Sequence, residues 1–173
     1  PGLPDLLAAH DSGSSNSDNI TNQTTALRID GNAESGATVT LFDGATQIGT
    51  GTASGGNYQI FVNLTEGAHS LTARATNTAG FTSAASAALV VTVDTTPPAV
   101  PGVPDLNAAF DTGTNTDNLT SLTSGLTIDG SAEAGATVQI LDGLTVLGSG
   151  NAGAGSFAIP INLSAGTITL TAR

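Results

Sequence analysis

The sequence predicts an all-β protein built from two similar domains in tandem. Three observations support this prediction: short stretches alternate between apolar and polar residues, turns rich in Gly, Asn and Asp separate them, and the whole arrangement occurs twice. Residues with β-branched side chains, which favour strands, are abundant. No stretch of useful length shows the 3.6-residue apolar period of a helix.

The duplication is visible in matching motifs. The segments 1–6, 36–39 and 71–74 return as 101–106, 135–138 and 170–173. A proline-rich connector, 94–101, joins the copies, so we predict domains at 1–98 and 99–173. The second copy has no counterpart of residues 75–98, which contain the apolar run 89–93. We therefore expect its terminal strand to be missing, either because the chain is part of a longer protein or because a partner supplies the strand.

Within the first copy, the alternation places strands at five segments: 27–30, 38–41, 57–62, 71–76 and 89–93. The Asp43-Gly44 and Asp142-Gly143 pairs are typical of hairpin turns. About seven strands in about 100 residues is the pattern of an immunoglobulin-like β-sandwich. The Cys pair and Trp of antibody domains are absent, so a variant without the disulfide is expected.

The composition excludes several functions. The 173-residue chain carries a formal net charge of −11, which opposes binding to nucleic acid, and it has no apolar stretch long enough to insert into a membrane. It contains no Cys, hence no disulfide and no thiol nucleophile. His10 and His69 have no counterparts in the second copy, and no repeated Ser/His/Asp set occurs. We expect the protein not to be an enzyme.

One loop in each copy is dense in oxygen donors. Residues 11–19 include Asp11 and Asp18, and the second copy keeps Asp111 and Asp117. Carboxylates, amides and hydroxyls around a Gly-permitted turn are the ligands that Ca²⁺ selects, so we predict a Ca²⁺ site in each loop. The alternative is that Asp, Asn, Ser and Gly simply form good turns.

A second acidic cluster is predicted where the copies join. Asp94 ends the first copy, Asp105 opens the second, and Glu133 lies in one of its early loops. In head-to-tail sandwiches these carboxylates could converge, and a divalent cation there would relieve their repulsion and stiffen the joint. The alternative is three separate, solvated carboxylates.

The ordered motifs resemble the bacterial Ig-like repeats of giant surface adhesins, among them BapA-type biofilm proteins and type I-secreted RTX adhesins. The matching segments are Pro-Asp-Leu at 4–6, the loop 11–21, the run 31–44, the segment 64–77 and the end 93–98. The resemblance implies an extracellular stalk of tandem domains, stiffened by Ca²⁺, on a bacterial cell surface. It carries metal ligation over to Asp11, Asp18, Asp94, Asp111 and Asp117. Asn77 and Phe81 stand where the family often has acidic residues or Asn.

We therefore expect a structural extender of a secreted adhesin that supports cell adhesion or biofilm formation, with neighbouring repeats of the same chain as its partners. Two alternatives remain: a module that binds a glycan or a protein, and a subunit of a strand-exchanged extracellular filament. A binding module predicts unusual aromatic or charged loop tips, and the sequence indicates none in either copy. The adhesive target is not predicted.

Overall fold

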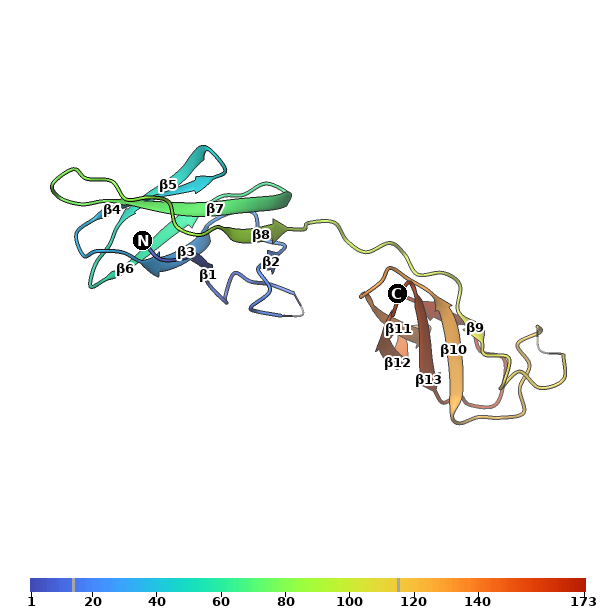
Figure 1. Cartoon of the computed structure of the whole chain (residues 1–173). Helices are drawn as coiled ribbons and strands as arrows, with labels where there is room; N and C mark the ends of the chain where they lie inside the picture. Colours follow the sequence, from blue (N-terminus) through green and yellow to red (C-terminus); the bar gives the residue numbers. More distant parts are fainter. Residues whose placement is uncertain (14, 115) are drawn as a thin grey trace. The chain divides into compact units, whose positions relative to one another are not determined.

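A computed structural model describes residues 1–13, 15–114 and 116–173, which form two compact units, Pro1–Thr96 and Pro97–Arg173 (Figure 1). The boundary thus follows residue 96, whereas the sequence placed it after residue 98. The described residues form strands and no helices, which confirms the predicted all-β class. None of the described segments is a helix that could span a membrane.

Unit 1 is a sandwich of two sheets. One sheet has the order β1 (Asp5–Leu6), β3 (Leu27–Asn32), β6 (Asn57–Val62). The other has the order β2 (Ile20–Thr21), β8 (Leu89–Val93), β7 (Gly67–Thr76), β4 (Thr38–Asp43), β5 (Thr46–Thr52). Alternate residues of each strand point inward, so apolar side chains from both sheets form one buried core.

Unit 2 repeats this pairing on a smaller scale. One sheet has the order β13 (Ser156–Ile161), β10 (Leu126–Ser131), β9 (Asp105–Leu106). The other has the order β12 (Thr145–Asn151), β11 (Thr137–Asp142), β14 (Leu170–Ala172). The described part of unit 2 contains no counterpart of β2 or of β8.

In unit 1, the pairing of β2 and of the first half of β7 depends on one strand, β8. In unit 1, β2 pairs with β8, and the first half of β7 pairs with β8 from Gly67 opposite Val93 to Leu71 opposite Leu89. Without β8 these segments have no partner for their main-chain groups. Accordingly, the counterpart of the ten-residue β7 is the three-residue β14, which keeps only its pairing with β11.

Each unit contains a glycine covered by an aromatic ring. Gly31 of β3 lies opposite Tyr58 of β6, and Gly130 of β10 lies opposite Phe157 of β13. A Cβ at either glycine would overlap the ring, so the close approach requires Gly.

Tyr58 is 2% exposed, and among the described residues its hydroxyl has no hydrogen-bond partner. Burial first, and the charge of Asp30 second, raise the pKa of Tyr58 to about 12.

We predict that Tyr58→Phe stabilises unit 1. The substitution removes a buried hydroxyl that has no partner and keeps the ring over Gly31, as Phe157 does in unit 2. The expected gain is about 1 kcal/mol in the free energy of unfolding. Thermal and urea unfolding of the full chain would measure it. The reciprocal Phe157→Tyr should destabilise unit 2, and a loss of stability in Tyr58→Phe would contradict the interpretation.

Candidate metal centre in the acidic loops

The predicted loop of unit 1 connects β1 in one sheet to β2 in the other. Asp11 lies at its start and is only 5% exposed. Its Oδ2 accepts a hydrogen bond from the Asn19 amide at 3.1 Å, and Asn19 has a positive φ of 59°. The Asn19 carbonyl in turn accepts a hydrogen bond from the amide of Thr92 in β8 at 2.9 Å. Asp11 therefore fixes the loop at the point where it joins the second sheet.

The other oxygen of Asp11 is the strongest indication of a cation site. Oδ1 is buried and has no hydrogen-bond partner among the described residues. A buried, ionised oxygen without a partner is costly, and a bound cation would compensate for it. Asp18 is exposed, and its Oδ1 accepts a hydrogen bond from the Ile20 amide at 3.2 Å. The donor set of the loop therefore fits a hard cation such as Ca²⁺.

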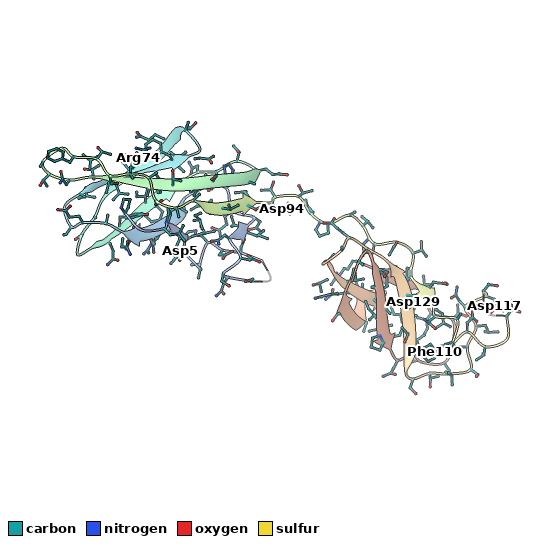
Figure 2. All side chains as sticks on the ribbon, in the orientation of Figure 1. Asp5, Arg74, Asp94, Phe110, Asp117 and Asp129 are labelled. Atoms are coloured by element: carbon teal, nitrogen blue, oxygen red, sulfur yellow. The ribbon has the colours of Figure 1, made fainter. Side chains whose placement is uncertain are left out.

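In the loop of unit 2, both oxygens of the buried carboxylate have hydrogen-bond partners. Asp111 is 7% exposed, and its two oxygens accept hydrogen bonds from the amides of Asn118 and Leu119, both at 3.1 Å. Asp117, on an exposed part of the loop (Figure 2), also accepts from the Leu119 amide, at 3.2 Å. Here the turn-forming role accounts for the observed contacts of both carboxylates.

Carboxylates and histidines do not surround either loop. Across residues 1–13, 15–114 and 116–173, no three Asp, Glu or His side chains lie close enough together to hold a metal ion. An ion beside Asp11 would therefore depend on hydroxyl, amide or main-chain oxygens for its remaining ligands. Ser14 and Asn115, which belong to the predicted loops, lie outside the described residues.

The three junction residues make contacts within their own units. Asp94, in unit 1, accepts a hydrogen bond at Oδ1 from the Thr96 amide at 3.0 Å. In unit 2, Asp105 lies opposite Asp129 across β9 and β10, and Glu133 Oε2 accepts from the Ala99 amide at 3.1 Å. Since Asp94 belongs to one unit and the other two residues to the second, a shared site stays a prediction.

Two carboxylates hold the ends of the connector. Glu66 accepts hydrogen bonds from the hydroxyls of Thr95 and Thr96, the latter at 2.9 Å. Glu133 holds the Ala99 amide, as described above. The role of Glu66 was not predicted, and its counterpart in the second copy is Ala165.

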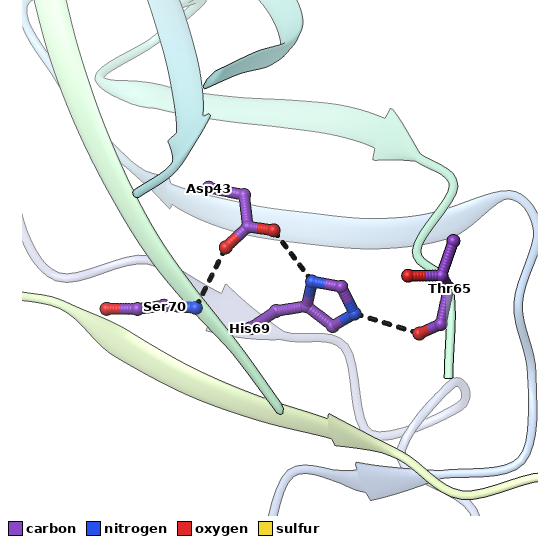
Figure 3. Close-up of polar contacts among 4 residues, drawn as sticks. All are labelled: Asp43, Thr65, His69 and Ser70. Atoms are coloured by element: carbon purple, nitrogen blue, oxygen red, sulfur yellow. Dashed lines mark hydrogen bonds and ion pairs between the residues drawn. The ribbon is translucent and has the colours of Figure 1, made fainter. Parts of the chain in front are cut away.

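His69 forms a second polar cluster that the sequence did not reveal (Figure 3). Its Nδ1 lies 2.7 Å from Asp43 Oδ2 at the end of β4, and its Nε2 lies 2.8 Å from the Thr65 carbonyl oxygen. Asp43 Oδ1 also accepts from the Ser70 amide at 3.0 Å. Because both ring nitrogens face acceptors, the protonated imidazolium satisfies both contacts, whereas the neutral ring can donate only one. The cluster therefore ties the β4–β5 turn to the segment before β7.

The surroundings of His69 set its protonation. Burial lowers its pKa, but the hydrogen bonds to Asp43 and to the Thr65 carbonyl, together with the charge of Asp43, outweigh burial and raise the pKa above its ordinary value. A pKa that is higher in the folded state than in the unfolded state stabilises the fold below the unfolded value of about 6.5. This stabilisation is lost as the pH rises through the folded-state pKa.

We predict that the stability of unit 1 falls as the pH rises from below about 6.5 through the raised pKa of His69. His69→Ile, which introduces the residue found at position 168, should remove this dependence and leave unit 2 unchanged. Thermal unfolding between about pH 5 and pH 9 would measure both effects. His10→Gln serves as the control for the other histidine, and an equal pH dependence in His69→Ile would contradict the assignment.

The described geometry defines a class: two immunoglobulin-like β-sandwich units in tandem. A family model described as "Bacterial Ig-like domain" matches residues 1–95, and the chain belongs to that family, as its sequence motifs predicted. Comparison with curated proteins gives no match.

Two solved structures are among those that match this chain. The first, "Biofilm associated protein - BSP domain", is 20% identical with a TM-score of 0.31, and the alignment covers 88% of this chain and 25% of that chain. The second, described as fibronectin(III)-like modules of Clostridium thermocellum CbhA, is 19% identical with a TM-score of 0.42, covering 88% of this chain and 78% of that one. This chain thus spans a quarter of the length of the biofilm-associated structure.

Proposed function

We propose that the chain is a spacer segment of a bacterial surface protein, in which repeated Ig-like units extend the molecule and support adhesion or biofilm formation outside the cell. One observation carries the proposal: a single chain of a bacterial Ig-like family contains two sandwich units with similar strand pairing, joined by a short proline connector. A spacer needs units of similar build linked by chain that resists bending.

The contacts of the connector support a mechanical role. Thr95 and Thr96 are held to unit 1 by Glu66, and Ala99 is held to unit 2 by Glu133. Only Pro97 and Pro98 lie between these anchored residues, and the pyrrolidine ring restricts φ at both. Little of the connector is then left with free backbone rotation, which favours a stiff link.

We further propose that Ca²⁺ stiffens the chain at the acidic loops and at the joint. The buried Oδ1 of Asp11 supports this for the loop of unit 1, since it faces no donor among the described residues. Asp11 also fixes Asn19, which pairs with β8, so an ion held there would brace both sheets.

In the loop of unit 2, Asp111 and Asp117 accept hydrogen bonds from amides, and an ion there would have to share these oxygens. At the joint, Asp94, Asp105 and Glu133 remain the proposed ligands.

We predict that Ca²⁺ raises the unfolding midpoint of unit 1. At about a hundred times its dissociation constant, a ligand specific to the folded state adds about 2.7 kcal/mol. Differential scanning calorimetry with Ca²⁺ and with excess chelator would measure the shift. Asp11→Asn should abolish it, because the neutral amide no longer requires a cation, whereas Asp5→Asn controls for the loss of one charge. A midpoint that is the same under both conditions at low ionic strength would refute the loop site.

We predict that the connector is ordered through its two glutamates. In Glu66→Ala, the amide order parameters of Thr95 and Thr96 should fall from about 0.85 to below about 0.6, and in Glu133→Ala that of Ala99 should fall likewise. ¹⁵N relaxation of the full chain measures each amide. Glu34→Ala is the matched control, because Glu34 occupies the position of Glu133 in the first copy.

Small-angle scattering of the same variants, with and without Ca²⁺, reports the flexibility of the joint. Unchanged order parameters in both variants would contradict the role of the anchors. A scattering profile that does not respond to Ca²⁺ would contradict an ion at the joint.

One observation favours a second candidate, a binding module. The expectation that no aromatic loop tip exists was wrong: Phe81, in the loop after β7, is 75% exposed. Asn77 holds this loop, because its Oδ1 accepts hydrogen bonds from the amides of Ala79 and Phe81 at 3.1 and 3.0 Å. An exposed aromatic side chain on a loop whose backbone is held in this way can stack on a sugar ring or insert into a protein pocket. A glycan array probed with the wild type, Phe81→Ser and the control Phe61→Ser would test it, and binding lost only in Phe81→Ser would support it.

A further inference from the structure

The first sheet of unit 1 carries a polar pocket. Its volume is about 440 Å³, within the range of about 300–1,000 Å³ that is usual for small-molecule sites. Strands β1, β3 and β6 provide its lining, and most of the lining residues are charged or carry a side-chain amide: Asp5, Arg28, Asp30, Asn32, Asn57 and Gln59. Gly31 and Tyr58 complete the lining.

Strand pairing brings these polar residues into neighbouring rows. Asp30 lies opposite Asp5 of β1 and also opposite Gln59 of β6. In the next row, Asn32 lies opposite Asn57. Apart from Asp30, which is half-buried, these residues are exposed, so their side-chain oxygens and amides are accessible to a ligand. The pocket therefore places hydrogen-bond acceptors and donors side by side on one surface.

An ion pair in the pocket keeps part of its hydrogen-bonding capacity free. Arg28 Nε and Nη2 donate to Oδ1 and Oδ2 of Asp30 at 2.7 and 2.8 Å. The guanidinium has further N–H groups, and each carboxylate oxygen has a second lone pair, so both side chains can contact a ligand while they remain paired. Because the two charges of the pair cancel, Asp5 carries the one uncompensated charge of the lining.

Tyr58 adds a hydroxyl that the fold does not require. It lines the pocket, and among the described residues its buried hydroxyl has no hydrogen-bond partner. In unit 2, Phe157 occupies the same position over Gly130 without a hydroxyl. A buried donor without a partner lowers stability. A ligand bound in the pocket would give the Tyr58 hydroxyl its partner.

The corresponding strands of unit 2 show that the sheet itself does not need this lining. In β10 and β13, the pairing keeps the register of β3 and β6. At the positions of the Arg, the Gln and the two Asn residues, however, these strands carry short side chains: Thr127, Ala158, Ser131 and Ser156. Only the two aspartates are retained, as Asp105 and Asp129. The long polar side chains of the pocket are therefore specific to unit 1.

The chemistry of the lining selects a neutral ligand that is rich in hydroxyl groups. The two carboxylates oppose an anion, and the guanidinium of Arg28 opposes a cation beside Asp30. Among the lining residues only Tyr58 has an apolar ring, which disfavours a peptide that needs apolar anchors. A hydroxyl both donates and accepts, so a set of hydroxyls matches a surface on which carboxylates, amides and a guanidinium lie together.

We propose that this pocket of unit 1 binds a neutral sugar ring, such as that of a hexose, through hydrogen bonds to its hydroxyls. Asp5 and Asp30 accept these bonds, Arg28 donates, and the amide of Gln59 does both. The hydroxyl of Tyr58 gains a partner in the bound sugar. The site is independent of the spacer role and of Ca²⁺, and none of its lining residues belongs to the loop after β7.

The test titrates the full chain with glucose, galactose and mannose, each separately, and follows the backbone amides by ¹H–¹⁵N NMR. For at least one hexose we expect saturable shifts at residues 28–32 and 57–59, and none at the matching residues 127–131 and 156–158. The dissociation constant should lie in the millimolar range, because a ligand with few atoms binds weakly.

Two variants separate contacts with the sugar from stability. Gln59→Ala, which introduces the residue found at position 158, should weaken binding at least about tenfold through lost hydrogen bonds. Tyr58→Phe should weaken binding while it raises the stability of unit 1, because its hydroxyl would serve the ligand and not the fold. Gln47→Ala is the matched control, since it removes the same side chain from an exposed position of β5 in the other sheet. It should bind like the wild type.

Four results would overturn the proposal. The first is the absence of saturable shifts with all three hexoses, and the second is unchanged affinity in Gln59→Ala. The third is unchanged affinity in Tyr58→Phe, because the unpartnered hydroxyl would then have no role in binding. The fourth is loss of binding in Phe81→Ser, which would place the sugar at the loop after β7.

Discussion

The pairing of β8 with two neighbours is the interaction on which the rest of unit 1 depends. This one strand extends the second sheet from β7 to β2, places Leu89 opposite the buried Leu71, and pairs with the first half of β7. In the described residues of unit 2, the other strands keep the same pairings, and the counterpart of β7 is the three-residue β14.

Polar side chains then tie the loops to this framework. Asp11 connects its loop to Asn19, and Asn19 connects to β8, so loop order and strand order are coupled. His69 and Asp43 fasten the opposite edge of β7 to the β4–β5 turn, and Glu66 fastens the departing chain. The core consists mostly of aliphatic side chains with few aromatic rings. Such polar contacts help to specify one arrangement of its loops, because hydrogen-bonding groups are costly to leave unpaired.

Much of the fold follows from local sequence. The strands at β3, β4, β6, β7 and β8 were predicted because their apolar residues alternate with a period of two. The strand β5 was not, because Gly49 and Gly51 replace apolar residues where the strand lies against Ile60. The two-residue β2 was also missed, since it exists only through its pairing with β8. Of the predicted site residues, the structure gives Asp11 and Asp111 buried positions that their composition alone did not distinguish from solvated turns.

The sequence by itself determined the duplication, the all-β class and the family, because repeats, strand alternation and turn residues are local signals that survive without knowledge of contacts. Only the tertiary structure decided which carboxylates are buried and which oxygen of Asp11 has no partner among the described residues. It also decided that His69 contacts Asp43 and that Glu66 accepts hydrogen bonds from the connector. The physical reason is that burial and hydrogen-bond satisfaction depend on segments far apart in the chain. Asp11, for example, lies in a polar loop by its sequence, yet contacts with Asn19 and the neighbouring strands leave it only 5% exposed.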